Sequence, residues 1–397
     1  MGEKLNKDPY AELGVSSKKE GVHEATKNLS KGLYPGAFCQ IVSVPSILPG
    51  EVQDKYVQVI HSDGVGTKSN VAYIAMMEGM GTDYLRRCPQ DALVMNTDDM
   101  ACVGITNDIY ISNHIARNAN RVNDEAIAEI ISGYSDFYQK MAALGINLYN
   151  AGGETADVGS YTTTLGIDVT ATAMMEKSKV IDASNIASGN YIVGLASDGI
   201  ATYEDRYNSG IRSNGLTLAI NSLLSPYYRK YRETMDGTID EEKLFTGKYR
   251  LENKVYGDSN IADLILSPTR TYLPILKDVL ENESIKVNGI IHCSGGGLTK
   301  SINFGENVAY IKDNLPTAPI IFDLIQKERN IDDQYMYQTF NMGIGMEIIV
   351  PTLEEAERVR SIANNYGVSA DIIGQVAKSN GGNVVEIGKT KKIVYTK

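Results

Sequence analysis

The strongest constraint on this fold is a strand that ends in a glycine loop and leads straight into a helix. Residues 56–63 (YVQVIHSD) have the β-branched, apolar composition of a buried strand, and helical spacing follows over residues 70–80. A second run, residues 161–175 (YTTTLGIDVTATAMM), predicts a long strand. Residues 351–367 (PTLEEAERVRSIANNYG) predict a helix that ends at a glycine. Such alternation is typical of α/β and α+β proteins.

The length and one change in composition predict more than one domain. At 397 residues the chain exceeds the ~150 residues of an ordinary domain. The sequence becomes polar and turn-rich over residues 176–190, and a fresh apolar strand, YIVGLAS, follows. We therefore predict an N-terminal domain over residues 1–180 and a C-terminal domain over residues 181–397. Residues 204–256, rich in Tyr, Arg, Asp and Gly, predict an elaborated loop region with short helices.

Charge and cysteine usage narrow the class of protein. The net charge of -11 disfavours nucleic acid and anionic membranes as partners, because both require a positive surface. The four cysteines form no CxxC pair, which argues against a zinc ribbon and suits a reducing cytosol. The opening MGEKLNKDPY holds no apolar signal segment, and no run approaches the ~18 apolar residues that cross a bilayer. We expect a soluble, cytoplasmic small-molecule enzyme or binding protein.

The loop after the first strand, HSDGVGTKSN, offers a carboxylate beside a backbone that can approach phosphate closely. Asp63 ends the strand, and Gly64, Gly66, Thr67 and Lys68 follow it. The GxxxxGK[ST] spacing of a P-loop is absent. A plain tight turn is the alternative, because Asp-Gly is common in turns.

Two further segments of the first half carry acidic side chains. In MNTDDM, Asp98 and Asp99 are costly to bury without a cation or hydrogen-bond donors, and the alternative is an exposed helix N-cap. In NAGGETADVGSY, Gly152 and Gly153 precede Glu154, and the alternative is a surface loop. Taken as three acidic loops, these segments predict an Mg²⁺ site formed by the carboxylates of Asp63, Asp99 and Glu154.

Two glycine-containing loops in the second half suit an anion. GIRSNGLTLA opens a helix with Ser213 and Asn214 as donors, although an ordinary N-cap would look the same. HCSGGGLTKSI places His292 before three consecutive glycines, Gly295, Gly296 and Gly297, which suit a phosphate. His292 is a candidate general base or hydrogen-bond donor, and a structural histidine is the alternative.

Eight motifs in order resemble one family. DGVGTK, NTDDM, GGETAD, EKSKVID, RSNGLTL, SPTRTY, HCSGGG and YQTFNMGIGM are similar to those of aminoimidazole ribonucleotide synthetase, also called phosphoribosylformylglycinamidine cyclo-ligase, from about Tyr10 to the C-terminus. The resemblance implies an α+β fold of two domains. The N-terminal domains of a homodimer would pair into a β-barrel, with ATP bound nearby, and the C-terminal domain would be an α/β sandwich.

The resemblance also implies the chemistry. ATP, with Mg²⁺, would phosphorylate the formyl oxygen of formylglycinamidine ribonucleotide, and an amidine nitrogen would close the imidazole ring with loss of phosphate. The metal ligands carried over by motif are Asp63, Asp99 and Glu154. Residues carried over to the nucleotide, the phosphates or the substrate are Asp63, Gly64, Gly66, Thr67, Lys68, Gly152, Gly153, Ser213, Asn214, Gly295, Gly296 and Gly297. The candidate catalytic residues are Asp99, His292 and Lys68.

The chain departs from the family pattern at three places. LYPGAFCQI has one glycine where the family has a glycine-rich segment, residues 198–210 resemble an insertion, and Ile211-Arg212 replaces a common Pro-His pair. The alternatives are a related ATP-using enzyme, of the selenophosphate synthetase, thiamine-monophosphate kinase or hydrogenase-maturation type, and a non-catalytic nucleotide-binding protein. Cys39 lacks the glycine-rich setting of a selenophosphate synthetase nucleophile.

Overall fold

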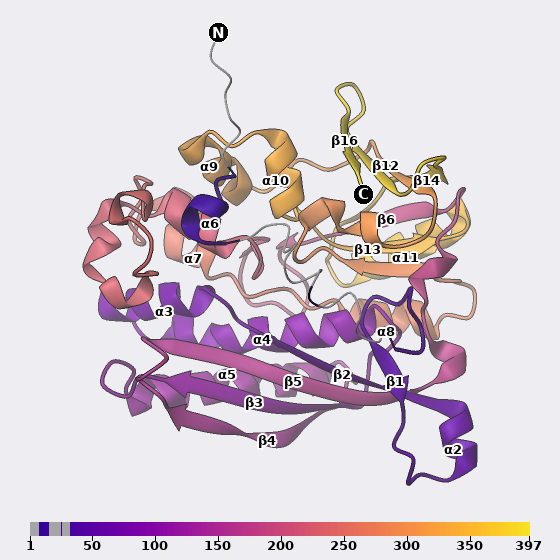
Figure 1. Cartoon of the computed structure of the whole chain (residues 1–397), viewed down its shortest axis with the longest axis horizontal. Helices are drawn as coiled ribbons and strands as arrows, with labels where there is room; N and C mark the ends of the chain where they lie inside the picture. The colour runs from indigo at the N-terminus through magenta and orange to yellow at the C-terminus, as the bar shows by residue number, and fades with distance from the viewer. Residues whose placement is uncertain (1–7, 16–24, 26–31) are drawn as a thin grey trace.

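The computed structural model describes residues 8–15, 25 and 32–397. Two β-sheets dominate it, one built from the first half of the chain and one from the second (Figure 1). The prediction of a mixed fold with two sheets is confirmed, while the division into domains at residue 180 stays a prediction. The first seven residues, on which the expectation of no signal segment partly rested, lie outside the described residues.

The first sheet has five strands in the order β1-β2-β5-β3-β4, and only β3 and β4 run parallel. Its strands are β1 (Ile41–Ser43), β2 (Tyr56–Gly64), β3 (Ile109–Arg117), β4 (Leu148–Asp157) and β5 (Leu165–Glu176). The helices of this half are α2 (Gly50–Lys55), α3 (Lys68–Met77), α4 (Asp83–Ala101) and α5 (Asp124–Ala143), with short 3₁₀ turns η1 (Ala11–Leu13), η2 (Lys177–Lys179) and η3 (Ala183–Asn185).

The second sheet has seven strands in the order β11-β13-β6-β14-β12-β15-β16. They are β6 (Tyr191–Ala196), β11 (Gly289–His292), β12 (Val308–Lys312), β13 (Ile344–Val350), β14 (Ala370–Lys378), β15 (Val384–Ile387) and β16 (Ile393–Thr396). Two small ribbons pair β7 (Asp198–Gly199) with β8 (Asn208–Ser209) and β9 (Lys254–Tyr256) with β10 (Ser259–Asn260). The helices are α6 (Leu216–Leu223), α7 (Ile261–Ile265), α8 (Leu273–Glu281), α9 (Ile320–Arg329), α10 (Asp333–Thr339) and α11 (Leu353–Asn365), and the 3₁₀ turns are η4 (Pro226–Lys230), η5 (Arg232–Thr234), η6 (Glu241–Lys243) and η7 (Gly297–Asn303).

Helices α3, α4 and α5 cover one face of the first sheet and lie between that sheet and the second half of the chain (Figure 1). Along β5, burial alternates strictly with exposure, as expected for a strand with one covered face. The uncovered face carries four exposed apolar side chains, Ile60, Tyr110, Tyr149 and Met174. The sheet has the form expected of half a barrel, with its open face toward solvent.

The MNTDDM segment differs from the expectation of an acidic loop. It lies in the last turns of α4, where Asn96, Thr97 and Asp98 are fully buried. Helix α4 is covered on one side by the first sheet and on the other by the second half, so its polar side chains find partners on both sides. Neither a loop nor an exposed N-cap describes this segment, because it forms the buried C-terminal part of a 19-residue helix.

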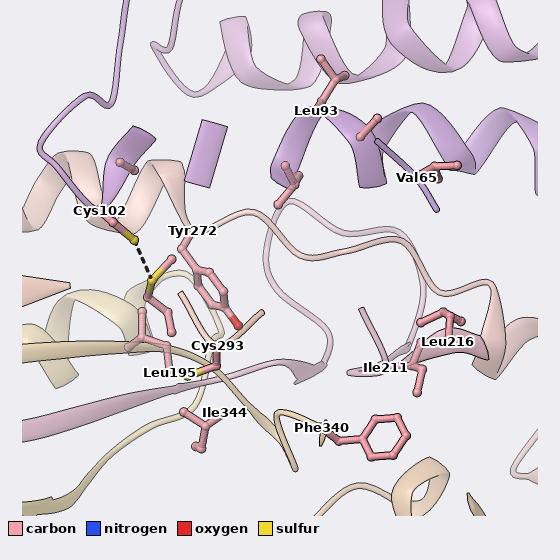
Figure 2. Packing of buried hydrophobic residues seen from close by; sticks show 14 of the residues in the cluster. Val65, Leu93, Cys102, Leu195, Ile211, Leu216, Tyr272, Cys293, Phe340 and Ile344 are labelled. Carbon is pink, nitrogen blue, oxygen red and sulfur yellow. Dashed lines mark hydrogen bonds between the residues drawn. The ribbon is translucent and has the colours of Figure 1, made fainter. Parts of the chain in front are cut away.

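The hydrophobic core is continuous across the two halves. Figure 2 shows Leu93 of α4, Cys102 just after α4 and Val65 just after β2 facing side chains of the second half, including Tyr272, Leu195 and Ile344. The thiol of Cys102, just after α4, lies 3.9 Å from the sulfur of Met346 on β13. Apolar burial at this junction therefore fixes α4 against the second sheet. In the described part of the chain, no helix is long and apolar enough to cross a membrane.

Candidate functional site

The DGVGTK loop turns the chain from β2 into α3. The amide of Val65 donates to the carbonyl of Ile167 at 2.9 Å, and Gly66 has a left-handed φ of 61°. A Cβ on Gly64 would lie 2.0 Å from Oδ1 of Asp168 on the neighbouring strand and 2.9 Å from the carbonyl oxygen of Ile167, so a larger residue would have to displace both. Asp63 is exposed at the end of β2, and its Oδ1 accepts a hydrogen bond from the amide of Gly64 at 2.7 Å.

Lys68 does not project from this loop toward solvent. It is 1% exposed, and its Nζ donates to Oδ1 of Asp91 at 2.6 Å and to the carbonyl of Ser267 at 2.7 Å. Oδ1 of Asp91 also accepts from Ser213 Oγ at 2.9 Å and from Thr269 Oγ1 at 2.6 Å. Lys68 and Ser213 therefore belong to a buried network that joins the two halves, an environment that favours a structural role for Lys68.

Asp99 forms the centre of a second polar group. Its Oδ1 lies 2.5 Å from Nδ1 of His292, at the end of β11, and its Oδ2 lies 3.4 Å from Nε2 of His61 on β2. Asn96 connects this group to the loop, because its Oδ1 lies 2.9 Å from Nδ1 of His61 and its Nδ2 donates to the carbonyl of Asp63 at 3.1 Å. The structure thus brings Asp99 and His292 close to the end of β2, where Asp63 lies.

The charges of this group are set by burial and by hydrogen bonds. Burial and then the positive charge of Arg212 lower the pKa of His292 to about 4, so the ring is neutral. Burial would raise the pKa of Asp99, but the hydrogen bonds with His292 and His61 outweigh it and hold that pKa below its usual value. Burial raises the pKa of the neighbouring Asp98 to about 7. A neutral, fully buried His292 is poorly placed to act directly on a substrate.

The two glycine-containing loops of the second half face each other. A Cβ on Gly295 would lie 3.6 Å from Oδ1 of Asn214. Gly296 and Gly297 have left-handed φ values of 94° and 52°, and a Cβ on Gly297 would lie 2.4 Å from the carbonyl oxygen of Phe340. The two loops that were each expected to suit an anion therefore lie next to each other, and their role in binding one stays a prediction.

Lys300 supplies a cation next to the triplet, and the sequence reasoning did not single it out. Its Nζ donates to Ser294 Oγ at 2.5 Å and lies 4.4 Å from the ring centre of Phe38. Its charge helps to lower the pKa of Asp99. A lysine three residues after a glycine triplet is the sequence feature that could have identified it as a candidate phosphate ligand.

Glu154 lies apart from the other predicted metal ligands. It is an exposed residue of strand β4, not a loop residue, and it pairs with His114 of β3. His114 pairs with Asp168 of β5, which in turn pairs with Gly64 of β2. Three strand spacings of ~4.8 Å put Glu154 about 14 Å from the end of β2. Gly152 and Gly153 share its strand.

Within the described residues, no group of three or more His, Cys, Asp or Glu side chains is placed to hold one metal ion. One chain thus does not assemble the expected set of Asp63, Asp99 and Glu154. Magnesium commonly uses one or two carboxylates together with substrate phosphates and water. The exposed carboxylate of Asp63, with Asp99 nearby on the other side of His61, fits that smaller requirement.

The fold and this site define a class: two-sheet α+β proteins with glycine loops and a buried acid–histidine pair at the junction of their halves. Residues 42–175 match the family described as "AIR synthase related protein, N-terminal domain", and residues 235–387 match "AIR synthase related protein, C-terminal domain". The chain belongs to the AIR synthase related family.

Several relatives carry the name phosphoribosylformylglycinamidine cyclo-ligase. The relative from Methanocaldococcus jannaschii is 30% identical over 83% of this chain and 82% of its own length. That from Methanococcus vannielii is 32% identical over 87% and 81%, and that from Acetivibrio thermocellus is 32% identical over 94% and 98%. Among solved structures, tt0281 from Thermus thermophilus covers 94% of this chain and 97% of its own, at 14% identity and a TM-score of 0.47.

Proposed function

We propose that the chain is an ATP-dependent phosphoribosylformylglycinamidine cyclo-ligase that converts formylglycinamidine ribonucleotide to 5-aminoimidazole ribonucleotide, ADP and phosphate in purine biosynthesis in the cytoplasm. The observation that carries the proposal is the closeness of the SNG loop to the glycine triplet, where a Cβ on Gly295 would lie 3.6 Å from Oδ1 of Asn214, with Asp99 and His292 at the same junction. Family membership and the cyclo-ligase names of relatives that match over most of their length support it.

The chemistry explains what such a site must do. An amide oxygen is a poor leaving group, and transfer of a phosphoryl group from ATP makes it a good one. The amidine nitrogen can then attack the activated carbon, and phosphate departs with the former formyl oxygen. Magnesium would neutralise charge on the phosphates. The rest of the catalysis is positioning and electrostatic stabilisation, so no covalent nucleophile is required.

Exposure decides which residues we assign to the metal, the nucleotide and the ribonucleotide. The reachable carboxylate of Asp63 is the first candidate ligand for Mg²⁺, with the less exposed Asp99 as the second. Gly64, Gly66 and Thr67 offer close backbone to the nucleotide. Asn214, the glycine triplet and Lys300 would contact a phosphate or the ribonucleotide, which the closeness of these groups supports.

The homodimer is part of the proposal. Ile60, Tyr110, Tyr149 and Met174 are between 42% and 58% exposed on the open face of the first sheet. Ile60 aligns across β5 with Tyr110, whose ring stacks on Tyr149 at 4.9 Å. This open face, with its exposed Ile, Tyr and Met side chains around Thr172, suits coverage by a second copy of the same face. Pairing of two such sheets would close the barrel.

The test combines purified protein with MgATP and formylglycinamidine ribonucleotide, and measures aminoimidazole ribonucleotide and ADP. We expect both products in equal amounts. Selenide and thiamine monophosphate serve as competing substrates for the alternative ATP-using relatives. Turnover of ATP with either of these, and none with the ribonucleotide, would remove the cyclo-ligase assignment.

A further inference from the structure

Arg212 is a fully buried arginine directly behind the acid–histidine pair. It is 1% exposed, and its backbone has a left-handed φ of 60°, which non-glycine residues adopt rarely. Its guanidinium carbon lies 5.4 Å from the ring centre of Tyr272, and its Nη1 donates to the carbonyl of Arg270 at 3.4 Å. A guanidinium held in this way cannot reach a ligand at the surface.

Gly345 on β13 provides the room for this side chain. A Cβ at that position would lie 2.6 Å from Nη1 of Arg212 and 2.1 Å from the hydroxyl of Tyr272. Meanwhile Arg270, the other large buried cation here, is occupied by two hydrogen bonds to Glu204. The guanidinium of Arg212 therefore fills the slot between Gly345 and Tyr272.

The remaining contact of Arg212 is with the ring of His292. Nη2 of Arg212 meets Nε2 of His292, while Nδ1 of the same ring lies 2.5 Å from Oδ1 of Asp99. Arginine can only donate hydrogen bonds, and an ionised carboxylate can only accept them. Nε2 must then be the acceptor and Nδ1 must carry the proton. The two partners together fix one tautomer and one orientation of the imidazole.

The orientation of His292 decides which oxygen of Asp99 is occupied. Oδ1 accepts from the ring of His292, so Oδ2 is left facing His61 on β2. The side chain of His61 is 19% exposed and that of Asp99 11%, whereas that of His292 is fully buried. The row Arg212, His292, Asp99, His61 therefore runs from the interior toward the end of β2.

Arg212 is not explained by stability alone. Its Nε is buried without a hydrogen-bond partner in the described structure. A buried charge with an unsatisfied donor is costly, so its presence calls for a use of the contact that it does make.

We propose that Arg212 is a positioning residue for the magnesium–nucleotide site: it locks the ring of His292, which holds the carboxylate of Asp99 with Oδ2 toward the end of β2. The inference rests on the proposed function only for the identity of the ligand. Partners that orient a ligating carboxylate typically contribute 10–100-fold to metal affinity or activity.

The test compares Arg212→Met, which keeps much of the volume and removes every donor, with Arg212→Lys, which keeps a cationic donor. Binding of MgATP is measured by calorimetry over a range of Mg²⁺ concentrations, without turnover. We expect Arg212→Met to weaken Mg²⁺-dependent binding about 10–100-fold, and Arg212→Lys to weaken it less. Arg206→Met is the matched control, because Arg206 is 53% exposed in its pair with Asp83.

Nitrogen-15 spectra of the imidazoles give a second readout that merely structural damage would not produce. The chain has four histidines, so the signals can be assigned with single His→Gln variants. We expect the Nε2 signal of His292 to move in Arg212→Met and in Arg212→Lys, and that of His114 to stay in place. If Arg212→Met fails to fold, the spectrum and Mg²⁺ affinity of Arg212→Lys decide the matter.

An unchanged Mg²⁺ affinity together with an unchanged His292 signal would overturn the inference. So would a loss of thermal stability without any loss of Mg²⁺ affinity. Wild-type protein that binds no MgATP would overturn both this inference and the proposed function. Wild-type protein that binds MgATP but forms no aminoimidazole ribonucleotide would remove the proposed function alone.

Discussion

Lys68 gives the sharpest test of how the glycine loop is used, because a structural and a nucleotide-binding role predict different results. Its ammonium group is 1% exposed and bonded to Asp91 and Ser267, so replacing it with Met leaves a buried carboxylate without its cation. Breaking a buried ion pair in this way typically costs about 3–5 kcal/mol.

The structure places the expected cost at the lower end of that range. Oδ1 of Asp91 keeps three other donors, namely the hydroxyls of Ser213 and Thr269 and the amide of Thr269. We therefore expect a loss of about 3 kcal/mol, which corresponds to roughly 6–12 °C in Tm for an unfolding unit of about 150–250 residues. In the double variant Lys68→Met, Asp91→Asn the unpaired buried carboxylate is gone. We therefore expect its loss of stability to be ~1–3 kcal/mol smaller than the sum of the losses of the two single variants.

The assay is thermal unfolding followed by circular dichroism, since the chain has no tryptophan. Lys55→Met is the matched control, because Lys55 is 57% exposed in its pair with Glu176 and such surface pairs contribute ~0–1 kcal/mol. A Lys68→Met protein that keeps the wild-type Tm but no longer binds MgATP would refute the structural reading. That result would show that Lys68 contributes to nucleotide binding, as the glycine-loop motif predicts.

Three further predictions follow from burial and packing. If the protein forms the proposed dimer, Ile60→Glu should convert it to monomers in light scattering, and a dimer that persists would remove the barrel proposal. Gly345→Ala should lower the free energy of unfolding by about 1–3 kcal/mol, because the added Cβ would meet Tyr272 and Arg212. An unchanged Tm would show that these two side chains move to make room. Asp98 has its pKa raised by burial from 3.8 to about 7, so the folded protein keeps a proton that the unfolded chain loses above about pH 4. Stability should fall by about 3 kcal/mol between pH 4 and 7, and Asp98→Asn should flatten that slope; parallel profiles would contradict it.

The local fold was largely predictable because it depends on short-range patterns. The strand expected over residues 56–63 is β2, Tyr56–Gly64, and the helix expected over residues 351–367 is α11, Leu353–Asn365. Thr352 and Glu355 close a capping box at the start of α11, a signal written into the sequence itself. The expected strand over residues 161–175 begins later, at Leu165.

The site was only partly predictable because its geometry depends on long-range packing. The pairing of Asp99 with His292 joins residues 193 positions apart, and only the docking of α4 on the second sheet creates it. The same docking buries Lys68 against Asp91, a partner that the motif gave no reason to choose. The sequence groups Glu154 with Asp63 because both are expected in acidic loops, but Glu154 lies within β4, and the strand order puts two other strands between β4 and β2.

The most direct test of the central claim follows the formyl oxygen. Formylglycinamidine ribonucleotide labelled with ¹⁸O in its formyl group is incubated with the protein and MgATP, and the released phosphate is analysed by mass spectrometry. Activation by phosphoryl transfer predicts one ¹⁸O atom in the phosphate for each aminoimidazole ribonucleotide formed. Unlabelled phosphate, with the label lost to water, would contradict the proposed mechanism.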